Sequence, residues 1–193
     1  VYNTLTVLGI AKSLGIALED AAGALKEACG VKGRIEVVPT PGMPYCVLID
    51  YAHSPDGLEK VLKSVRDFCK GRLISVFGCG GDRDPIKRPI MGRIGVESAD
   101  FAIITSDNPR TEEPMAIIRD ILQGITPDMG EYTVIEDRRR AIRYAMDIAK
   151  KDDIIVLAGK GHETYQDIGG QKHPFDEKVV VREILAEMDE GRE

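Results

Sequence analysis

Residues 101–110 read FAIITSDNPR, an apolar run that ends in the polar loop Asp107-Asn108-Pro109-Arg110. The run Phe101–Thr105 is short and rich in β-branched residues, which is typical of a buried strand. Similar runs recur along the chain, at Cys46–Ile49, Leu73–Phe77, Tyr132–Ile135 and Ile154–Ala158. Amphipathic stretches of helical period alternate with them, near Gly57–Cys69, Ile86–Glu97, Pro114–Leu122, Arg138–Lys150 and Glu177–Met188. This alternation predicts an α/β fold, in which a mostly parallel sheet is covered by helices on both faces.

The first 29 residues have a different pattern and are predicted to form two helices. Apolar residues recur at helical spacing in the first of them, at Leu5, Leu8, Ala11 and Leu14. Gly15 is expected to end this helix, and a second helix begins after Leu18 and ends near Gly30. We therefore expect two bodies, residues 1–30 and 31–193. Because the chain starts at Val1 rather than at Met and enters a helical pattern at once, we interpret it as a piece of a longer protein.

The composition is that of an ordinary globular protein, with 43% apolar and 30% charged residues. The net charge of −6 argues against a nucleic-acid partner, which requires a basic surface. No apolar run approaches the roughly 20 residues needed to span a bilayer, and no signal peptide is visible, so we expect a cytoplasmic protein without a membrane partner. The four cysteines form no CxxC pair, which favours reduced thiols over a zinc site; they are Cys29, Cys46, Cys69 and Cys79.

Four of the predicted strands are followed at once by unusual polar or glycine-rich loops. These loops are Asp50–Pro55 (DYAHSP), Gly78–Asp84 (GCGGDRD), Asp107–Arg110 (DNPR) and Gly159–Glu163 (GKGHE). The carboxyl ends of parallel strands share one edge of the sheet, and open α/β sheets bind ligands in the crevice outside that edge. The sequence therefore predicts that the four loops form one binding site.

The chemistry of these loops suits an amino acid, although each loop also has a simpler explanation. The Arg110 guanidinium suits a carboxylate and Asp107 suits an ammonium, so together they could receive a zwitterionic head. The alternative is a surface ion pair between these two residues. Glu163 could likewise accept from an ammonium, or stand with a solvated Lys160 in an ordinary glycine turn. Asp50 could contact a nucleotide or only cap the helix after Pro55.

Five motifs together resemble the C-terminal domain of the Mur ligases, and most closely the diaminopimelate-adding members of that family. The motifs are Gly33–Glu36, Asp50–Asp56, Phe77–Arg83 with Lys87–Pro89 and Met91-Gly92, Asp107–Arg110, and Gly159–Glu163. The resemblance covers essentially the whole chain in the right order and implies a Rossmann-like domain. It also implies an ATP-dependent ligase that makes peptidoglycan precursor. ATP would activate the γ-carboxylate of UDP-N-acetylmuramoyl-L-alanyl-D-glutamate as an acyl phosphate, which the amine of meso-diaminopimelate attacks.

The resemblance also assigns roles to residues of this chain. The diaminopimelate receptor would comprise Arg83, Asp107, Asn108, Pro109, Arg110, Gly159 and Glu163. The nucleotide and phosphate site would receive Asn3, Arg34, Asp50, Tyr51 and His53. In the family the P-loop and the Mg²⁺ ligands lie in a central ATPase domain, whose last helices residues 1–30 resemble. No P-loop motif occurs in this chain, so we expect no catalytic residue and no metal site in it, and no ligase activity without its N-terminal and central domains.

Two other functions remain open at this point. The chain could be a free-standing Rossmann-type module that binds an amino acid or a nucleotide, although such a module would not need the two helices before Gly30. It could also belong to a folate-adding ligase, which shares the architecture but is not expected to carry the Asp107–Arg110 motif.

Overall fold

The computed structural model describes residues 2–27 and 30–190, and the chain divides into two compact units, Val1–Val31 and Lys32–Glu193. The first unit contains helices α1 (Tyr2–Ser13) and α2 (Leu18–Glu27). Gly15 follows α1 with a φ of +76°, a left-handed conformation that favours glycine and ends the helix as predicted. Cys29 lies outside the described residues.

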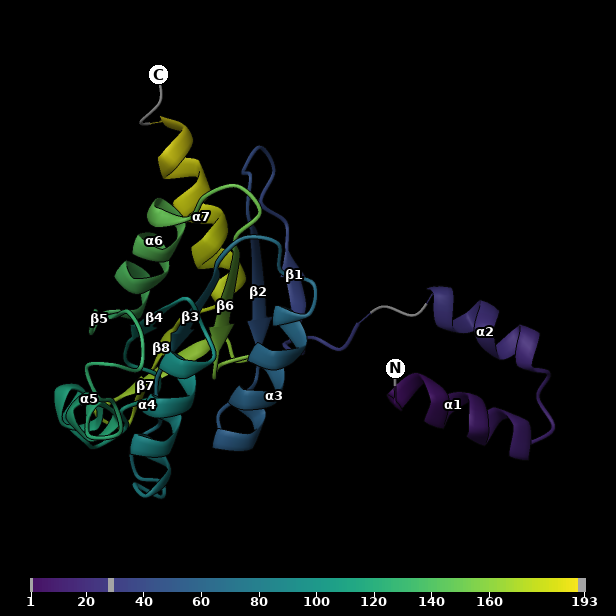
Figure 1. Cartoon of the computed structure of the whole chain (residues 1–193), viewed down its shortest axis with the longest axis horizontal. Helices are drawn as coiled ribbons and strands as arrows, with labels where there is room; N and C mark the ends of the chain where they lie inside the picture. Colours follow the sequence, from purple (N-terminus) through teal and green to yellow (C-terminus); the bar gives the residue numbers. More distant parts are fainter. Residues whose placement is uncertain (1, 28–29, 191–193) are drawn as a thin grey trace. The chain divides into compact units, whose positions relative to one another are not determined.

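The second unit is built on a six-stranded sheet (Figure 1). Its strands are β1 (Glu36–Val38), β2 (Cys46–Asp50), β3 (Leu73–Phe77), β4 (Phe101–Ile104), β5 (Tyr132–Val134) and β6 (Ile154–Ala158), in the spatial order β1-β2-β6-β3-β4-β5. The strands β2 to β6 pair in parallel, and only β1 is antiparallel. The prediction of a mostly parallel sheet is therefore confirmed.

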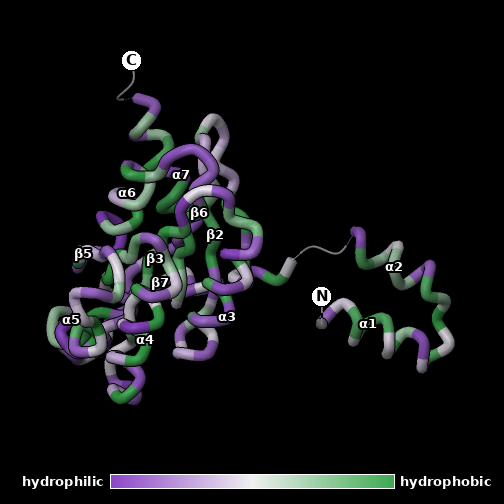
Figure 2. The backbone as a smooth tube through the Cα atoms, viewed as in Figure 1, coloured by the Kyte–Doolittle hydropathy of each residue, from purple (hydrophilic) through white to green (hydrophobic). Residues whose placement is uncertain are grey.

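Helices cover both faces of this sheet (Figure 1). One face carries α3 (Pro55–Arg66), α4 (Lys87–Glu97) and α5 (Pro114–Leu122), and the other carries α6 (Arg138–Ile148) and α7 (Glu177–Glu190). Successive side chains of a strand point to opposite faces, so Leu48 packs in the first layer while Val47 and Ile49 pack in the second. Figure 2 shows the resulting hydrophobic interior along β2, β3 and β6. Burial of each large aliphatic side chain contributes roughly 1.5–3 kcal/mol.

The path of the chain places a crevice near β6. The strands β2, β3 and β4 lead into helices on one face, whereas β5 and β6 lead toward helices on the other. Because β6 lies between β2 and β3, neighbouring strands send the chain to opposite faces. An open sheet binds ligands at the carboxyl ends of strands around such a switch point.

Three strands were not predicted. The edge strand β1 has three residues, and the antiparallel hairpin of β7 (Tyr165–Ile168) and β8 (Gln171–Pro174) has no apolar face. Gly169 and Gly170 turn this hairpin, both with positive φ. The start of α3 also differs, because it begins at Pro55 rather than at Gly57. None of the described helices is long and apolar enough to cross a membrane.

Candidate functional site

A pocket of about 380 Å³ lies at the carboxyl ends of the strands. All four of the predicted loops contribute to its wall, which is formed by Tyr51, His53, Gly80, Arg83, Asp84, Lys87, Asp107, Asn108, Arg110, Gly159 and Glu163. The prediction that the four loops meet at one edge of the sheet is therefore confirmed. The binding roles of these residues remain predictions.

Glycine allows the loops to pack against one another. A Cβ atom at Gly81 would overlap the carbonyl oxygen of Pro109, and one at Gly159 would overlap the carboxylate of Asp107. The amide of Gly81 also donates to the carbonyl oxygen of Asn108 over 2.9 Å. The glycine loop after β3 thus lies directly on the loop after β4, with no room for a side chain between them.

Asp107 is buried and does not form the surface ion pair with Arg110 that was one of the two explanations of this motif. Its Oδ1 lies 4.0 Å from Nζ of Lys160 instead, and its carbonyl oxygen accepts from Nε2 of Gln166 over 2.7 Å. The alternative of a surface pair is therefore wrong, because this loop is covered by the segment that follows β6.

Lys160 is completely buried, so the alternative of a solvated lysine in a glycine turn is wrong as well. Its ammonium donates to Oδ1 of Asn108 over 3.1 Å and to Oε2 of Glu163 over 3.3 Å. Burial lowers the pKa of Lys160, while the carboxylates of Asp107 and Glu163 act in the opposite direction. No sequence pattern selects this residue, because a lysine between two glycines has the pattern of an exposed loop.

The backbone of Arg110 adopts a left-handed conformation, with φ at +53°. The hairpin β7–β8 holds it there: Arg110 N donates to Asp167 O over 2.9 Å, and Gly169 N donates to Arg110 O over 2.6 Å. The guanidinium reaches the glycine loop, where Nη1 donates to Gly81 O over 2.6 Å. Arg110 lines the pocket, and the other four N–H groups of its guanidinium have no protein acceptor among the described residues, which suits an anionic ligand.

Two further cations lie on the pocket wall. Arg83 is exposed, and its Nη1 donates only to the neighbouring Asp82 O over 3.2 Å. Lys87 was not predicted as a site residue; it donates to His53 O over 2.8 Å and so joins the start of α4 to the loop after β2. The loop Gly78–Asp84 is also held by Glu112, whose carboxylate accepts from Asp82 N over 2.6 Å.

The residues predicted for the nucleotide are only partly brought together. Tyr51 and His53 line the pocket with ring centroids 4.7 Å apart, and the guanidinium of Arg34 lies 5.4 Å from the ring centroid of Tyr51. Asp50 is buried, and its Oδ2 accepts from Ile35 N over 2.8 Å. Asp50 is therefore not the cap of α3.

Three other placements complete the comparison with the predicted site. Ser54 caps α3, with Oγ accepting from Gly57 N over 3.2 Å. Pro109 is buried beneath the pocket and is not among the residues that line it. Asn3 is an exposed residue of α1 in the first unit. The described residues contain no group of three or more His, Cys, Asp or Glu that could hold a metal ion.

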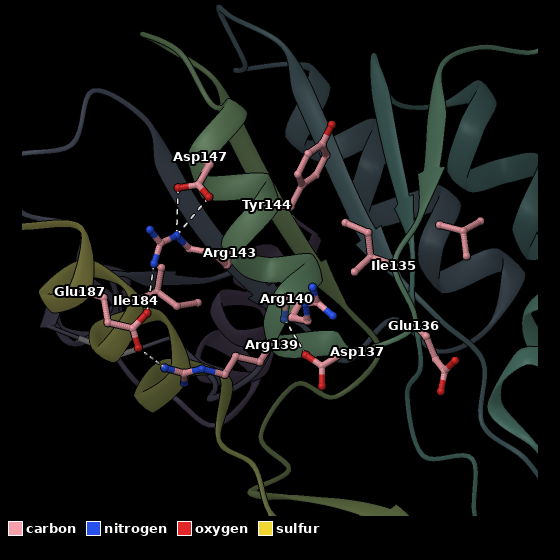
Figure 3. A pocket seen from close by; sticks show the side chains of 11 residues that line it. Ile135, Glu136, Asp137, Arg139, Arg140, Arg143, Tyr144, Asp147, Ile184 and Glu187 are labelled. Carbon is pink, nitrogen blue, oxygen red and sulfur yellow. Dashed lines mark hydrogen bonds and ion pairs between the residues drawn. The ribbon is translucent and has the colours of Figure 1, made fainter. Parts of the chain in front are cut away.

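A larger hollow of about 830 Å³ lies beside α6 and α7, where Arg139 and Arg143 form ion pairs with Asp147 and Glu187 (Figure 3). Arg143 donates to Asp147 and to Glu187, each over 3.0 Å, and Arg139 donates to Glu187 over 2.6 Å. None of the four loops contributes to this hollow. The pocket at the strand ends is therefore the better candidate for the site.

Comparison with known proteins identifies the family of this chain. A family model described as the glutamate ligase domain of Mur ligases matches residues 33–161, more than half of the chain. The chain belongs to the Mur ligase family. The match begins at Gly33 and extends through the strands that carry the pocket.

Among Mur ligases the chain is similar to curated relatives that share one name, UDP-N-acetylmuramoyl-L-alanyl-D-glutamate–2,6-diaminopimelate ligase. The enzyme of Clostridium acetobutylicum is 54% identical over 189 residues, and that of Clostridioides difficile is 54% identical over 188 residues. Each match covers 97% of this chain and 39% of the relative. The chain thus spans about two fifths of the length of these Mur ligases.

Solved structures of the family show the same fold. A structure of a 2,6-diaminopimelate ligase is 41% identical, with a TM-score of 0.78, and covers 94% of this chain and 37% of that one. A folylpolyglutamate synthase of Mycobacterium tuberculosis in complex with ADP reaches a TM-score of 0.57 at 24% identity, covering 78% of this chain and 34% of that one. The second likeness shows the shared fold alone.

Proposed function

We propose that this chain is the C-terminal, amino-acid-binding domain of an ATP-dependent ligase of the bacterial cytoplasm. The ligase adds meso-diaminopimelate to UDP-N-acetylmuramoyl-L-alanyl-D-glutamate during peptidoglycan synthesis. The names of the 54% identical relatives support this substrate pair. The lower identity of the folate-adding neighbours gives no comparable support for a folate substrate.

The observation that carries the proposal is that one pocket holds both the anions and the cations needed for an amino-acid head. Asp107 and Glu163 offer carboxylates to an ammonium, and Arg110 with Arg83 offers guanidinium groups to a carboxylate. Diaminopimelate ends in a second amino-acid head, whereas lysine ends in an ammonium alone. A lysine side chain would leave Arg110 without an anion, so the pocket favours diaminopimelate.

In the proposed reaction this domain acts by positioning the attacking amino acid. ATP with Mg²⁺ would supply the phosphoryl group that activates the carboxylate of the second substrate. The described residues offer no metal site, so we assign Mg²⁺ and most of the ATP contacts to the other domains of the ligase. Arg34, Asp50, Tyr51 and His53 are proposed to face the nucleotide or its phosphates, because Tyr51 and His53 line the same pocket.

The first unit is proposed to be the end of the central ATPase domain, with Asn3 near the nucleotide. Support comes from its apolar surface: Leu5, Ile10 and Leu14 are all more than half exposed in this chain. Apolar residues at helical spacing normally pack against a partner layer, which α1 and α2 do not provide for one another. A larger domain would cover them.

The test is to compare wild-type full-length ligase with its Arg110→Ala variant, using diaminopimelate and lysine. Loss of charged hydrogen bonds to the distal carboxylate should lower kcat/KM for diaminopimelate by about tenfold or more and leave lysine as poor a substrate as before. Arg139→Ala in the unrelated hollow is the matched control. A wild-type enzyme that ignores diaminopimelate would refute the proposed substrate, and unchanged discrimination in Arg110→Ala would refute the receptor.

A further inference from the structure

Lys160 is a buried cation whose hydrogen-bond and ion-pair partners all belong to the wall of the pocket. Its side chain has no exposed surface, and its ammonium contacts Asn108, Glu163 and Asp107 at 3.1, 3.3 and 4.0 Å. The rings of Tyr165 and Phe175 close over it, with centroids 5.8 and 5.9 Å from Nζ. The ligand therefore cannot reach this ammonium, and any effect of Lys160 on binding must pass through its neighbours.

Both polar atoms of the Asn108 carboxamide belong to the same network. Its Nδ2 donates to Oε2 of Glu163 over 2.8 Å. Its Oδ1 accepts from Nζ of Lys160 over 3.1 Å and from the amide of Asp167 over 2.9 Å. Two donors to Oδ1 fix the orientation of the amide, because the opposite orientation would bring NH₂ against both of them.

Glu163 is the group that this network positions. One oxygen, Oε2, accepts from both Asn108 and Lys160, and the carboxylate lies on the pocket wall. The other oxygen, Oε1, accepts from no protein donor among the described residues. With Oε2 fixed, the free oxygen has a defined direction before any ligand arrives, which reduces the entropic cost of binding.

The charges of this cluster also favour a cationic group. Two carboxylates, Asp107 and Glu163, face one buried ammonium, so one negative charge is left for a partner. Without Lys160 the two carboxylates would repel each other with no cation between them.

We propose that Lys160 is a positioning residue that holds Glu163 and Asn108 in the arrangement that receives the ammonium of the incoming amino acid. This role rests on the proposed function of the pocket, but it concerns a residue that does not itself touch the ligand. Lys160 should therefore determine the affinity for the amino acid and leave the two other substrates unaffected.

The experiment measures KM for diaminopimelate, ATP and the UDP-linked dipeptide with full-length ligase that carries Lys160→Met or Lys160→Arg. Lys160→Met keeps the length of the side chain but removes the charge and its hydrogen bonds. It should raise KM for diaminopimelate about ten- to a hundredfold and leave the other two KM values unchanged. Lys160→Arg, which retains a donor cation, should recover part of this loss.

The matched control is Arg72→Met, which breaks a partly buried ion pair with Asp153 at the opposite edge of the sheet. It should lower thermal stability without a change in KM for diaminopimelate. If Lys160→Met does not fold, Lys160→Gln carries the test, since it also removes the charge but places a polar amide in this buried cluster. A folded Lys160 variant with an unchanged KM for the amino acid, or with all three KM values raised alike, would overturn the positioning role.

The two proposals fail in different ways. If the wild-type enzyme prefers another amino acid, the proposed substrate is wrong, and the Lys160 variants are then assayed with the amino acid that it does use. A selective rise in KM for that amino acid would still support the role of Lys160.

Discussion

Nδ2 of Asn108 donates to Oε2 of Glu163 over 2.8 Å, although the two residues are 55 positions apart in the chain. They follow β4 and β6, and β3 lies between these strands. The hydrogen bond therefore spans the glycine-rich loop that follows β3. It joins two sides of the pocket. The position of the Glu163 carboxylate therefore depends on the N–H donor of the Asn108 amide.

Asn108→Asp should impair this link while hardly changing the size of the side chain. The variant places a carboxylate oxygen against Oε2 of Glu163, so a hydrogen bond is replaced by repulsion between like charges. We expect KM for diaminopimelate to rise by about tenfold or more in the full-length ligase. Steady-state kinetics will measure it.

The control for this variant is Gln123→Glu, at an exposed position where the amide lies beside Asp120 at 3.5 Å. The same change of amide to carboxylate should have no effect on KM there. Equal kinetics for Asn108→Asp and wild type would show that the link does not position Glu163.

Gly81→Ala should loosen the contact between the two loops at the centre of the site. Its Cβ would overlap the carbonyl oxygen of Pro109, and a backbone atom cannot move aside as a flexible side chain can. We expect a loss of about 1–3 kcal/mol in the free energy of unfolding, typical of overpacking. Denaturant unfolding of the chain will measure it.

Gly23→Ala is the matched control, because a Cβ on this residue of α2 meets nothing within 4 Å. Alanine is favoured over glycine inside a helix, so this change should not destabilise the chain. Wild-type stability in Gly81→Ala would mean that the loops are not packed as closely as the structure has them.

The strands and their loops were predictable because their patterns are local. Strands such as Ile154–Ala158 are buried on both faces and read as continuous apolar runs, so periodicity finds them. The hairpin of Tyr165–Ile168 and Gln171–Pro174 gives no such signal, since most of its side chains are polar and all are at least partly exposed. It is stabilised by its bonds to the loop of Arg110, which exist only in the folded chain.

In the site, too, the residues set by local sequence were predictable, and the residue set by tertiary contacts was not. Asp107 and Glu163 were selected because they follow strands, and the pocket does contain them. Lys160 was overlooked, since its burial depends on Tyr165 and Phe175, which belong to segments that follow it in the chain. A lysine between glycines has no sequence pattern that distinguishes a buried ammonium from a solvated one.

Cys79 should be inert toward alkylating reagents in the folded chain. Cys79 is 2% exposed, and burial raises the pKa of its thiol to about 12. At pH 8 only about one thiol in ten thousand would be ionised, and the thiolate is the reactive form. Iodoacetamide labelling followed by mass spectrometry should therefore modify Cys79 only after denaturation, and rapid labelling of the native chain would contradict its burial.

The same thiol should make the chain less stable in alkali. A pKa raised above the ordinary value of 9.0 stabilises the folded state below about pH 9, and this contribution is lost as the pH rises toward 12. Replacing the thiol by Cys79→Ala should flatten this part of the pH dependence. Thermal melting between pH 8 and 11 will compare the two chains, and parallel curves would count against the effect.

Asp153 should account for part of the loss of stability in acid. Burial acts to raise its pKa, but hydrogen bonds from Arg72 and from the amide of Lys150 outweigh burial and lower the pKa below its usual 3.8. A lowered pKa stabilises the fold above about pH 3.8, and the contribution is lost as the pH falls further. Asp153→Asn should therefore lower the free energy of unfolding by about 1.5–3 kcal/mol at pH 7, and by progressively less below pH 3.8.

Urea unfolding of the chain at pH 7 and pH 3 will test this, with Asp56→Asn as the control. Asp56 pairs with Lys60 on the exposed face of α3, where an ion pair contributes under about 1 kcal/mol. A cost of Asp153→Asn that is equal at both pH values would mean that hydrogen-bond geometry, rather than the charge of Asp153, stabilises this edge. Asp153 lies just before β6, and Lys160 lies just after it. A pH-dependent loss of stability would therefore mean that β6 has a carboxylate that stabilises the fold at one end and an ammonium in the wall of the site at the other.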